Sequence, residues 1–444
     1  IQEGSVKNFM DTAIICGLII LTVLILLLLA GVPIAAALGI SSICAILPVM
    51  DADAAVLTGA QRIFSGISVF SLLAIPFFIL AGNIMNKGGI AIRLINLAKV
   101  VTGRMPGALA QTNVLANMLF GAISGSGTAA ASAMGSIIGP IEKEEGYDPN
   151  FSAAANIATA PTGLLIPPSN VMITFSLVSG GTSVAALFMA GYLPGILWGI
   201  ACMIVIYLIA KKRGYRSSSS FTLKEKWNIF FQSLPCLFLI ILVIGGIIGG
   251  IFTATEGSVV AVVYSLILSL FVYKSIRLRD LPQILKDSAQ MTGIIIFLIG
   301  VSSIMSWVMA FTNIPSAVSS GLLSVSDNKY VIFLMINVIL LVVGTFMDMT
   351  PACLIFTPIF LPVCLALGMN PVHFGIMMIF NLCIGTITPP VGTTLFVGVR
   401  VGGVRIETVF RQLLIYFAAI FLVLMLVTYI PVISLWLPGL LGYV

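Results

Sequence analysis

The chain has 444 residues, of which 59% are hydrophobic and only 8% are charged, and its mean hydropathy is +1.18. A soluble domain carries roughly 25% charged residues to cover its surface, so this composition excludes a soluble protein and predicts a polytopic helical membrane protein. The net charge of +6 indicates membrane topology rather than nucleic-acid binding, because Lys and Arg collect in cytoplasmic loops.

The first half of the chain predicts three membrane spans and a basic surface segment. Residues 10–30, 33–50 and 70–86 are apolar over about the length that crosses a bilayer, and a short polar, amphipathic segment, 51–66, joins the second span to the third. Residues 87–104 are amphipathic and basic, so they are expected to lie along the cytoplasmic membrane surface.

A re-entrant hairpin and a broken helix are predicted next. Residues 106–140 are long enough to span, but the run Gly121–Ala129 in their middle is rich in Gly and Ser and does not sustain a helix. Residues 149–180 are apolar and interrupted by Gly163 and the Pro167-Pro168 pair, which opens the helix. Inside a bilayer, opened backbone is tolerated only where it is buried in protein or lines a wet cavity.

A basic stretch separates two halves of the chain. The span predicted at 184–210 ends at the basic residues 211–216, and a serine run follows within a cytoplasmic linker predicted at 217–226. The first repeat is therefore expected to cover residues 1–216, and the second residues 227–444.

The second half repeats the first at a constant shift of 222 residues. Gly163 falls on Gly385, and Pro167-Pro168 falls on Pro389-Pro390. The second half accordingly predicts spans at 232–251, 255–273, 292–312 and 413–433, a hairpin at 331–362 with its tip near 344–351, and a broken helix at 372–399. Two interrupted helices in corresponding places indicate the binding site of a secondary transporter.

The positive charges predict that the two halves have inverted topology. If residues 211–216 are cytoplasmic and each hairpin counts as no crossing, the basic loops after 86, 273 and 399 also fall inside. The first hairpin then opens from the cytoplasm and the second from the periplasm, with both termini periplasmic.

The two hairpin tips and the two breaks are expected to meet near the membrane midplane. Helix N-termini present free N–H groups that suit an anion, and C-termini present carbonyls that suit a cation. Oxygen-rich, mostly neutral side chains suit a hard monovalent ion such as sodium. They are Ser124, Ser126, Thr128, Ser169 and Asn170 in the first half, and Thr350, Thr388, Thr393 and Thr394 in the second. For any one of them alone, close helix packing is the competing interpretation.

Asp348 is the acid that lies deep in the apolar region of the second half. A charge there is costly, so it indicates function by default. It could bind a cation, carry a proton, or pair with a basic residue of the scaffold.

Other residues are interpreted as non-catalytic. His373 is the single histidine and is expected at a solvated helix end, and Trp198, Trp307 and Trp436 are expected at the membrane interface. The seven cysteines are scattered without a CxxC pair, which is typical of buried free thiols. Neither a P-loop nor an HExxH motif occurs, so the chain is not expected to be an enzyme.

Several motifs resemble the large membrane subunit of the tripartite ATP-independent periplasmic (TRAP) transporters, over nearly the whole chain. They are Leu73–Gly82, Ser124–Ala130, Pro167–Asn170 and Thr388–Thr393. The resemblance implies an elevator-type, sodium-driven importer with no organic cofactor, belonging to the bacterial inner membrane. It also implies a small four-helix membrane subunit and a periplasmic substrate-binding protein as partners. Some members fuse the two membrane subunits, which would suit a chain that begins at Ile1; removal of a preceding segment is the other explanation.

The substrates of this family are organic acids, among them C4-dicarboxylates and sialic acid, and the chain looks most similar to the sialic-acid branch. The resemblance implies one sodium ion at the first tip and break and another at the second, with the substrate between them. The implied ligands of the first ion are Ser124, Ser126, Thr128, Gly163, Pro168 and Asn170. Those of the second are Gly344, Asp348, Thr350, Gly385, Thr388, Pro390 and Thr393. The implied substrate contacts are Ser126, Thr128, Ser169, Asn170, Thr350, Thr393 and Thr394.

Two alternatives to a transporter remain open from the sequence. A channel or scaffold protein could use the breaks as a fixed pore or for packing, although channels usually build their filters from several subunits. A membrane-embedded enzyme is the more distant alternative.

Overall fold

The computed structural model describes residues 2–215, 222–326, 328–389 and 391–444. Every element of secondary structure in these ranges is a helix. Nine helical segments of the described residues are long and apolar enough to cross a membrane, or up to ten if a bent pair in the first half is one span. The chain is therefore an all-α polytopic membrane protein, as its composition predicts.

The first half contains eleven α-helices within its described residues. They are α1 (Gln2–Leu29), α2 (Ile34–Ile46), α3 (Ala52–Ile67), α4 (Ala74–Lys87), α5 (Ile90–Thr102), α6 (Ala108–Ser124), α7 (Gly127–Glu144), α8 (Pro149–Thr159), α9 (Thr162–Leu165), α10 (Asn170–Val178) and α11 (Val184–Arg213). A 3₁₀ turn, η1 (Phe70–Leu73), precedes α4.

The second half contains ten α-helices in the part that the structure describes. They are α12 (Leu223–Ile248), α13 (Ala254–Ile267), α14 (Leu281–Phe311), α15 (Ile314–Val325), α16 (Lys329–Phe346), α17 (Met349–Ala366), α18 (Pro371–Gly385), α19 (Thr393–Gly402), α20 (Ile406–Tyr429) and α21 (Val432–Leu440). A π-helical turn, η2 (Leu268–Val272), follows α13, and a 3₁₀ turn, η3 (Leu278–Asp280), precedes α14.

The helix boundaries of the two halves follow the repeat in the sequence. Helices α7 and α17 begin at Gly127 and Met349, 222 residues apart, and both are 18 residues long. Helices α8 and α18 both begin with a proline after a capping residue. Asp148 accepts a hydrogen bond from the N–H of Asn150, and Asn370 accepts one from the N–H of Val372. The same local signals therefore start equivalent helices in both halves.

The structure differs from the sequence prediction in segments that join the spans. Residues 51–66, expected to be a short polar, amphipathic connection, form helix α3 (Ala52–Ile67), which Asp51 caps by accepting a hydrogen bond from the N–H of Asp53. The span expected at 292–312 is the second part of the longer helix α14, and the amphipathic helix α15 was not predicted. A search for apolar runs of about 20 residues passes over such short, one-faced helices.

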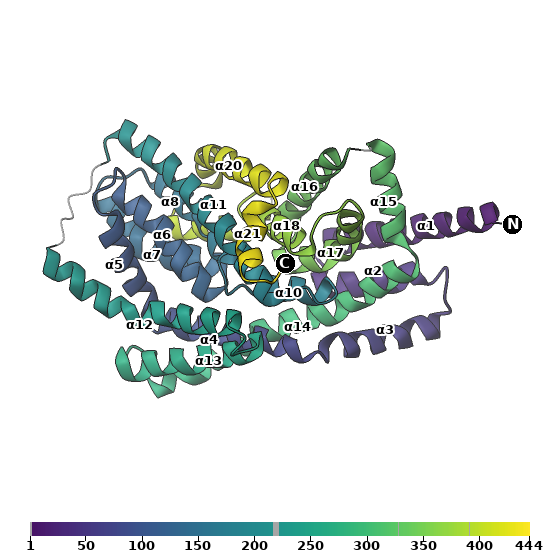
Figure 1. Cartoon of the computed structure of the whole chain (residues 1–444), viewed down its shortest axis with the longest axis horizontal. Helices are drawn as coiled ribbons and strands as arrows, with labels where there is room; N and C mark the ends of the chain where they lie inside the picture. Colours follow the sequence, from purple (N-terminus) through teal and green to yellow (C-terminus); the bar gives the residue numbers. More distant parts are fainter. Residues whose placement is uncertain (1, 216–221, 327, 390) are drawn as a thin grey trace.

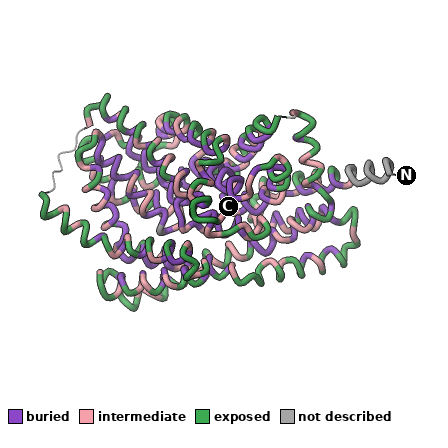
Figure 2. The backbone as a smooth tube through the Cα atoms, in the orientation of Figure 1, coloured by how far each residue is buried: buried purple, intermediate pink, exposed green. Residues whose placement is uncertain are grey.

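The helices form two parts that differ in burial. Helices α12, α4, α14 and α3 follow one long edge of the molecule, with α13 packed against α4 (Figure 1). The helices on either side of the hairpin turns and breaks pack against one another above this edge, α6 with α7 and α9, and α16 with α18. Burial is greatest in this central part, whereas the outer faces are exposed (Figure 2). Helix α18 is buried on nearly all sides, which explains its continuous apolar sequence.

Two predictions for side chains with polar tips were wrong. His373 is 1% exposed; its Nδ1 lies 2.8 Å from the Ser434 hydroxyl and its Nε2 lies 3.1 Å from the Thr428 carbonyl. Trp198 is fully buried and donates from Nε1 to the carbonyl of Ala158 at 2.9 Å. Both polar tips are satisfied by neighbouring helices instead of water, because α8, α11, α18, α20 and α21 pack together.

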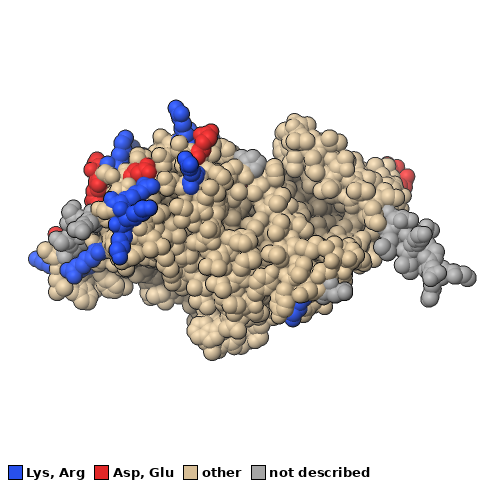
Figure 3. Space-filling model, turned by 90° about the horizontal axis from the view of Figure 1, so that it is seen from above, with Lys and Arg blue, Asp and Glu red and all other residues tan. Residues whose placement is uncertain are grey.

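Charged side chains gather at one end of the molecule, around α5, α8 and the last turn of α11 (Figures 1 and 3). In the view of Figure 3, the middle of the molecule carries few charges. The described residues form two ion pairs, Lys87 with Asp287 at 3.3 Å and Arg213 with Asp148 at 2.9 Å.

Candidate functional site

The turn between α6 and α7 is built from a glycine and a serine. Gly125 ends α6 with a φ of +60°, a conformation that favours glycine. Ser126 caps α7, because its Oγ accepts a hydrogen bond from the N–H of Ala129 at 3.2 Å. The Ser126 Oγ also lies 3.0 Å from the Thr128 Oγ1. The chain thus reverses direction over Gly125 and Ser126, and the hydroxyl groups of Ser126 and Thr128 lie together at the start of α7.

The turn between α16 and α17 has an acid at the corresponding cap position. Asp348 has extended backbone and precedes α17, but its side chain does not cap that helix. Instead, its Oδ1 accepts a hydrogen bond from the Thr393 hydroxyl at 3.3 Å, at the start of α19. Asp348 makes no ion pair within the described residues. Pairing with a basic residue, one of the three roles considered for this acid, therefore has no support.

The first broken helix bends by 48° between the segment α8–α9 and α10. The break leaves residues 166–169 outside helix, and it includes Pro167 and Pro168. The Ser169 Oγ and the Asn170 Oδ1 are buried there without a protein partner. Buried oxygens without a donor are uncommon in folded proteins and indicate a bound water, ion or ligand.

The second broken helix opens between α18 and α19. The Val391 N–H donates to the Thr345 carbonyl at 3.1 Å, and the Thr394 N–H donates to the Thr386 carbonyl at 3.0 Å. The Thr388 hydroxyl donates a hydrogen bond to the carbonyl of Ile384 in the preceding turn. The opened segment is therefore held by α16 on one side and by its own turn on the other.

Glycines let each hairpin touch its broken helix at backbone distance. A Cβ at Gly163 would overlap the backbone of Gly121 in α6, and a Cβ at Gly385 would overlap the backbone of Gly344 in α16. Close packing of this kind accounts for the residue type at Gly163, Gly344 and Gly385 without requiring that they bind an ion.

A cavity of about 450 Å³ lies where the two hairpin turns and the starts of α10 and α19 meet. Eight of the predicted site residues line it: Ser124, Ser126, Thr128, Asn170, Asp348, Thr350, Thr393 and Thr394. Six others do not line it: Gly163, Pro168, Ser169, Gly344, Gly385 and Thr388. Pro390 lies outside the described residues.

Part of the cavity wall was missed by the sequence reasoning. Asn83 and Asn86 of α4 and Met291 and Ile295 of α14 close the cavity on the side of the long edge. Asn83 is held in place because its Nδ2 donates to the Ser288 hydroxyl at 2.8 Å. The sequence could have indicated Asn83 and Asn86, because they are two amides three residues apart on one face of an apolar helix. Polar residues in membrane spans are often functional.

Four helices begin at this cavity and four end near it. Helices α7, α10, α17 and α19 direct their N-termini toward the cavity, and α6, α9, α16 and α18 end at the same turns and breaks. Free N–H groups and the positive ends of helix dipoles favour a carboxylate. Carbonyl, hydroxyl and amide oxygens, with Asp348 as the sole ionisable residue of the described lining, favour a hard monovalent cation. The described residues contain no cluster of His, Cys, Asp and Glu that could hold a transition metal.

The family comparison agrees with this architecture. Residues 21–433 match the family model of the tripartite ATP-independent periplasmic transporter, DctM component. The chain belongs to this family. The resemblance inferred from the motifs is thus confirmed, and this DctM-family permease is a membrane transport protein and not an enzyme.

Several relatives match this permease over most of its length. YgiK of Salmonella typhimurium is 54% identical over 94% of this chain and 95% of its own. The C4-dicarboxylate TRAP transporter large permease DctM of Rhodobacter capsulatus is 36% identical over 96% and 99%. The sialic acid TRAP transporter large permease SiaM of Vibrio cholerae is 37% identical over 86% and 90%.

The fold also resembles a solved transporter structure. The YdaH transporter of Alcanivorax borkumensis superposes with a TM-score of 0.65, covering 85% of this chain and 88% of its own, at 13% sequence identity. The permease therefore shares its fold with a transporter of very different sequence.

Proposed function

We propose that this permease imports an organic acid together with sodium ions, by an elevator movement in which the hairpins and broken helices travel along the helices of the long edge. A periplasmic binding protein delivers the substrate, and a small membrane subunit, separate or fused to this chain, completes the complex in the bacterial inner membrane. Sialic acid is the first substrate to test, and a C4-dicarboxylate is the alternative.

One observation carries the proposal. The central cavity is lined by both hairpin turns and by the starts of both broken-helix arms, while its opposite wall belongs to α4 and α14. A site shared between a compact group of hairpins and an outer group of spanning helices suits alternating access, because one group can move past the other with the site between them.

The sodium sites proposed here use the oxygens at each tip and break. At the first, the unpartnered Asn170 Oδ1 and the hydroxyls of Ser124, Ser126 and Thr128 support cation binding. At the second, the Asp348 carboxylate with Thr350 and Thr393 supports it. Gly163 and Pro168 remain proposed members of the first site through their backbone carbonyls. Gly344, Gly385, Thr388 and Pro390 remain proposed members of the second.

The substrate is proposed to lie between the two ions. Its carboxylate would meet the N-termini of α7, α10, α17 and α19, and the described lining contains no Lys or Arg to replace them. Ser126, Thr128, Ser169, Asn170, Thr350, Thr393 and Thr394 are the proposed contacts. Because the relatives named for sialic acid and for C4-dicarboxylates are 37% and 36% identical, identity alone does not decide between the two.

The experiment that tests this function measures uptake into proteoliposomes. Labelled sialic acid, and in parallel labelled succinate, is supplied with and without an inward sodium gradient and a cognate binding protein. We expect uptake that requires both. Uptake of succinate alone would keep the mechanism and replace the substrate. Flux that ignores both sodium and the binding protein would contradict symport and indicate a channel.

A further inference from the structure

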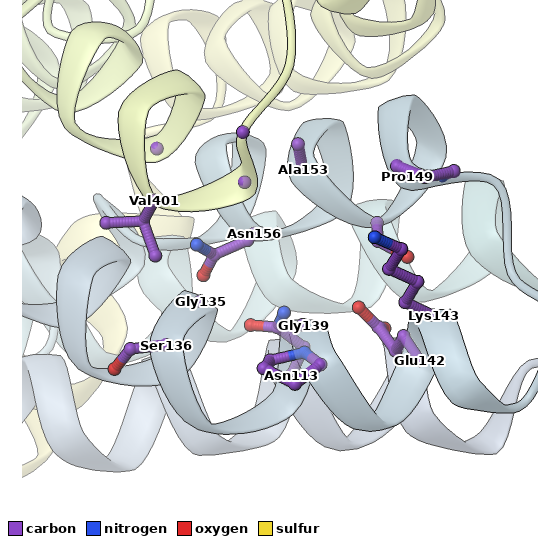
Figure 4. Close-up of a pocket in the computed structure, with 15 residues that line it drawn as sticks. Asn113, Gly135, Ser136, Gly139, Glu142, Lys143, Pro149, Ala153, Asn156 and Val401 are labelled. Atoms are coloured by element: carbon purple, nitrogen blue, oxygen red, sulfur yellow. The ribbon is translucent and has the colours of Figure 1, made fainter.

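A second cavity, of about 510 Å³, lies away from the central one, toward the end of α7. It is enclosed by α6, the C-terminal half of α7, the first turns of α8 and the end of α19, and it shares no lining residue with the central cavity. Figure 4 shows Glu142 and Lys143 near one end and Val401 near the other, with Asn113 and Asn156 between them. The cavity therefore lies between a hairpin arm of the first half and a helix of the second.

Glu142 is buried in the wall of this cavity without a hydrogen-bond or ion-pair partner. It is 1% exposed, and neither of its carboxyl oxygens has a hydrogen-bond partner in the protein. Lys143 also lines the cavity, but the ion pairs of the described residues do not include either residue. An ionised carboxylate that is buried without a partner is very unfavourable. The group must therefore take up a proton, be hydrated, or bind a cation.

Neighbouring side chains leave further polar atoms unpartnered in the same wall. The Asn113 Nδ2 and the Ser152 Oγ are buried without a protein partner. The amide of Asn156 already has a partner, since its Nδ2 donates a hydrogen bond to the carbonyl of Ala131 at 2.8 Å. A polar cavity of this size holds water readily, and water gives a carboxyl group a route for proton exchange.

Apart from Lys143, which makes no ion pair with Glu142, the charged and titratable groups around Glu142 do not favour its ionised form. Glu145 repels a second negative charge, Tyr147 after α7 is a neutral phenol, and Tyr416 of α20 presents a buried hydroxyl without a protein partner. The faces of α6 and α8 contribute amides and the Ser152 hydroxyl, and α19 contributes Gly398, Val401, Gly402 and Gly403. Glu142 lies in the last turn of α7, which is not one of the candidate spans, and burial raises its pKa to about 8, with a smaller contribution from the negative charge of Glu145.

We propose that Glu142 and this cavity form a proton-binding site, in which the carboxyl carries a proton while α7 and α19 are packed together. When water enters between the two helices, the O–H bond breaks, the proton passes to water, and the carboxylate remains hydrated in the opened cavity. The proton thereby favours the contact between the first hairpin and the second broken helix.

The direction of the pH effect follows from the raised pKa. Between the ordinary carboxyl pKa of 4.5 and about 8, the folded protein binds more protons at this residue than the unfolded chain does. Its stability therefore falls as pH rises across this window, and the contribution changes no further above about pH 8.

Thermal unfolding of the full chain in detergent tests the site. Between about pH 5.5 and pH 8.5, the Tm of the wild type is expected to fall by about 5 °C more than that of Glu142→Gln, which mimics the neutral acid. The matched control Glu144→Gln removes an exposed carboxylate two residues away and should keep the wild-type slope. A slope that survives in Glu142→Gln would overturn the proposal.

Two further measurements locate the effect and identify the ligand. In hydrogen exchange near pH 8.5, the peptide containing α19 should exchange faster in the wild type than in Glu142→Gln, and equally near pH 5.5. Replacing choline by sodium at constant ionic strength should leave the Tm slope unchanged; if sodium abolishes it, the ligand is a metal cation and the proton site is refuted. If Glu142→Gln does not fold, Glu145→Gln provides the test, since loss of this repelling carboxylate should move the midpoint of the wild-type slope to lower pH.

Discussion

At the scale of single residues, Asp348 connects two elements that lie 45 positions apart. Its carboxylate accepts a hydrogen bond from Thr393, so the second hairpin turn and the second break meet at one acid in the lining of the central cavity. A carboxylate that faces a polar cavity without a basic partner is suited to a coupling cation.

Replacing Asp348 tests this role. Asp348→Asn keeps the shape of the side chain but removes its charge, and a charged hydrogen bond or ion contact contributes roughly 1.5–3 kcal/mol. We expect initial uptake to fall about tenfold or more and its sodium dependence to weaken, with expression near normal. The control Asp287→Asn alters an exposed ion pair and should have little effect. A lower Tm with unchanged sodium dependence would indicate a structural role.

Ser126→Ala and Thr128→Ala test the first tip in the same assay. Both hydroxyls line the central cavity, and Ser126 also caps α7, so its loss is expected to cost about 1 kcal/mol of stability in addition to uptake. Thr128→Ala leaves the cap intact and should lower uptake with little change in Tm. Full sodium-dependent uptake in both variants would remove the proposed first site.

At the scale of elements, the contact between each hairpin and its broken helix depends on glycine. Gly163 packs on Gly121, and Gly385 packs on Gly344, with room for backbone only. Gly163 and Gly385, which occupy equivalent positions in the two halves, therefore each allow a hairpin and its broken helix to approach closely.

Alanine at these glycines should disturb the packing. Gly163→Ala and Gly385→Ala introduce a Cβ into the facing backbone, and overpacking of this kind costs about 1–3 kcal/mol. We expect a lower Tm and reduced uptake in both variants. Gly293→Ala in α14 is the matched control, because a Cβ there meets nothing within 4 Å. Equal Tm values for all three variants would show that these close glycine contacts do not contribute to stability.

At the scale of the whole molecule, the duplication brings equivalent elements of the two halves to one cavity. Charged residues gather at one end, which the positive-inside rule assigns to the cytoplasm (Figure 3). Inverted topology then requires that the two hairpins open to opposite sides of the membrane.

Cysteine labelling of the two hairpin roots tests this topology. Glu144 ends the first hairpin and Lys329 begins the second, and both are exposed. In spheroplasts, a membrane-impermeant maleimide should label Lys329→Cys directly and Glu144→Cys only after the membrane is permeabilised. Most native cysteines are buried and should add little background. Labelling of both variants from the same side would exclude the inverted arrangement.

The predictions for the turns and breaks, which depend on neighbouring residues, were correct, whereas those for two side chains, which depend on contacts between distant helices, were wrong. The hairpin turns at Gly125 and Asp348 and the break after Gly163 lie where the sequence indicates, because Gly, Pro and capping residues act on their own neighbours. His373 and Trp198 were misassigned, because a helix end and an aromatic side chain look the same in sequence whether water or another helix covers them.

The sequence by itself determined the membrane class, the positions of the turns and breaks, and eight residues of the cavity lining. These properties follow from hydropathy, proline and glycine, which act over one or two helical turns. Only the tertiary structure decided that α4 and α14 complete the cavity and that Glu142 is buried beside α19. Such contacts join residues of different helices that are far apart in the sequence, and they depend on which helix faces pack together, information that no local pattern contains.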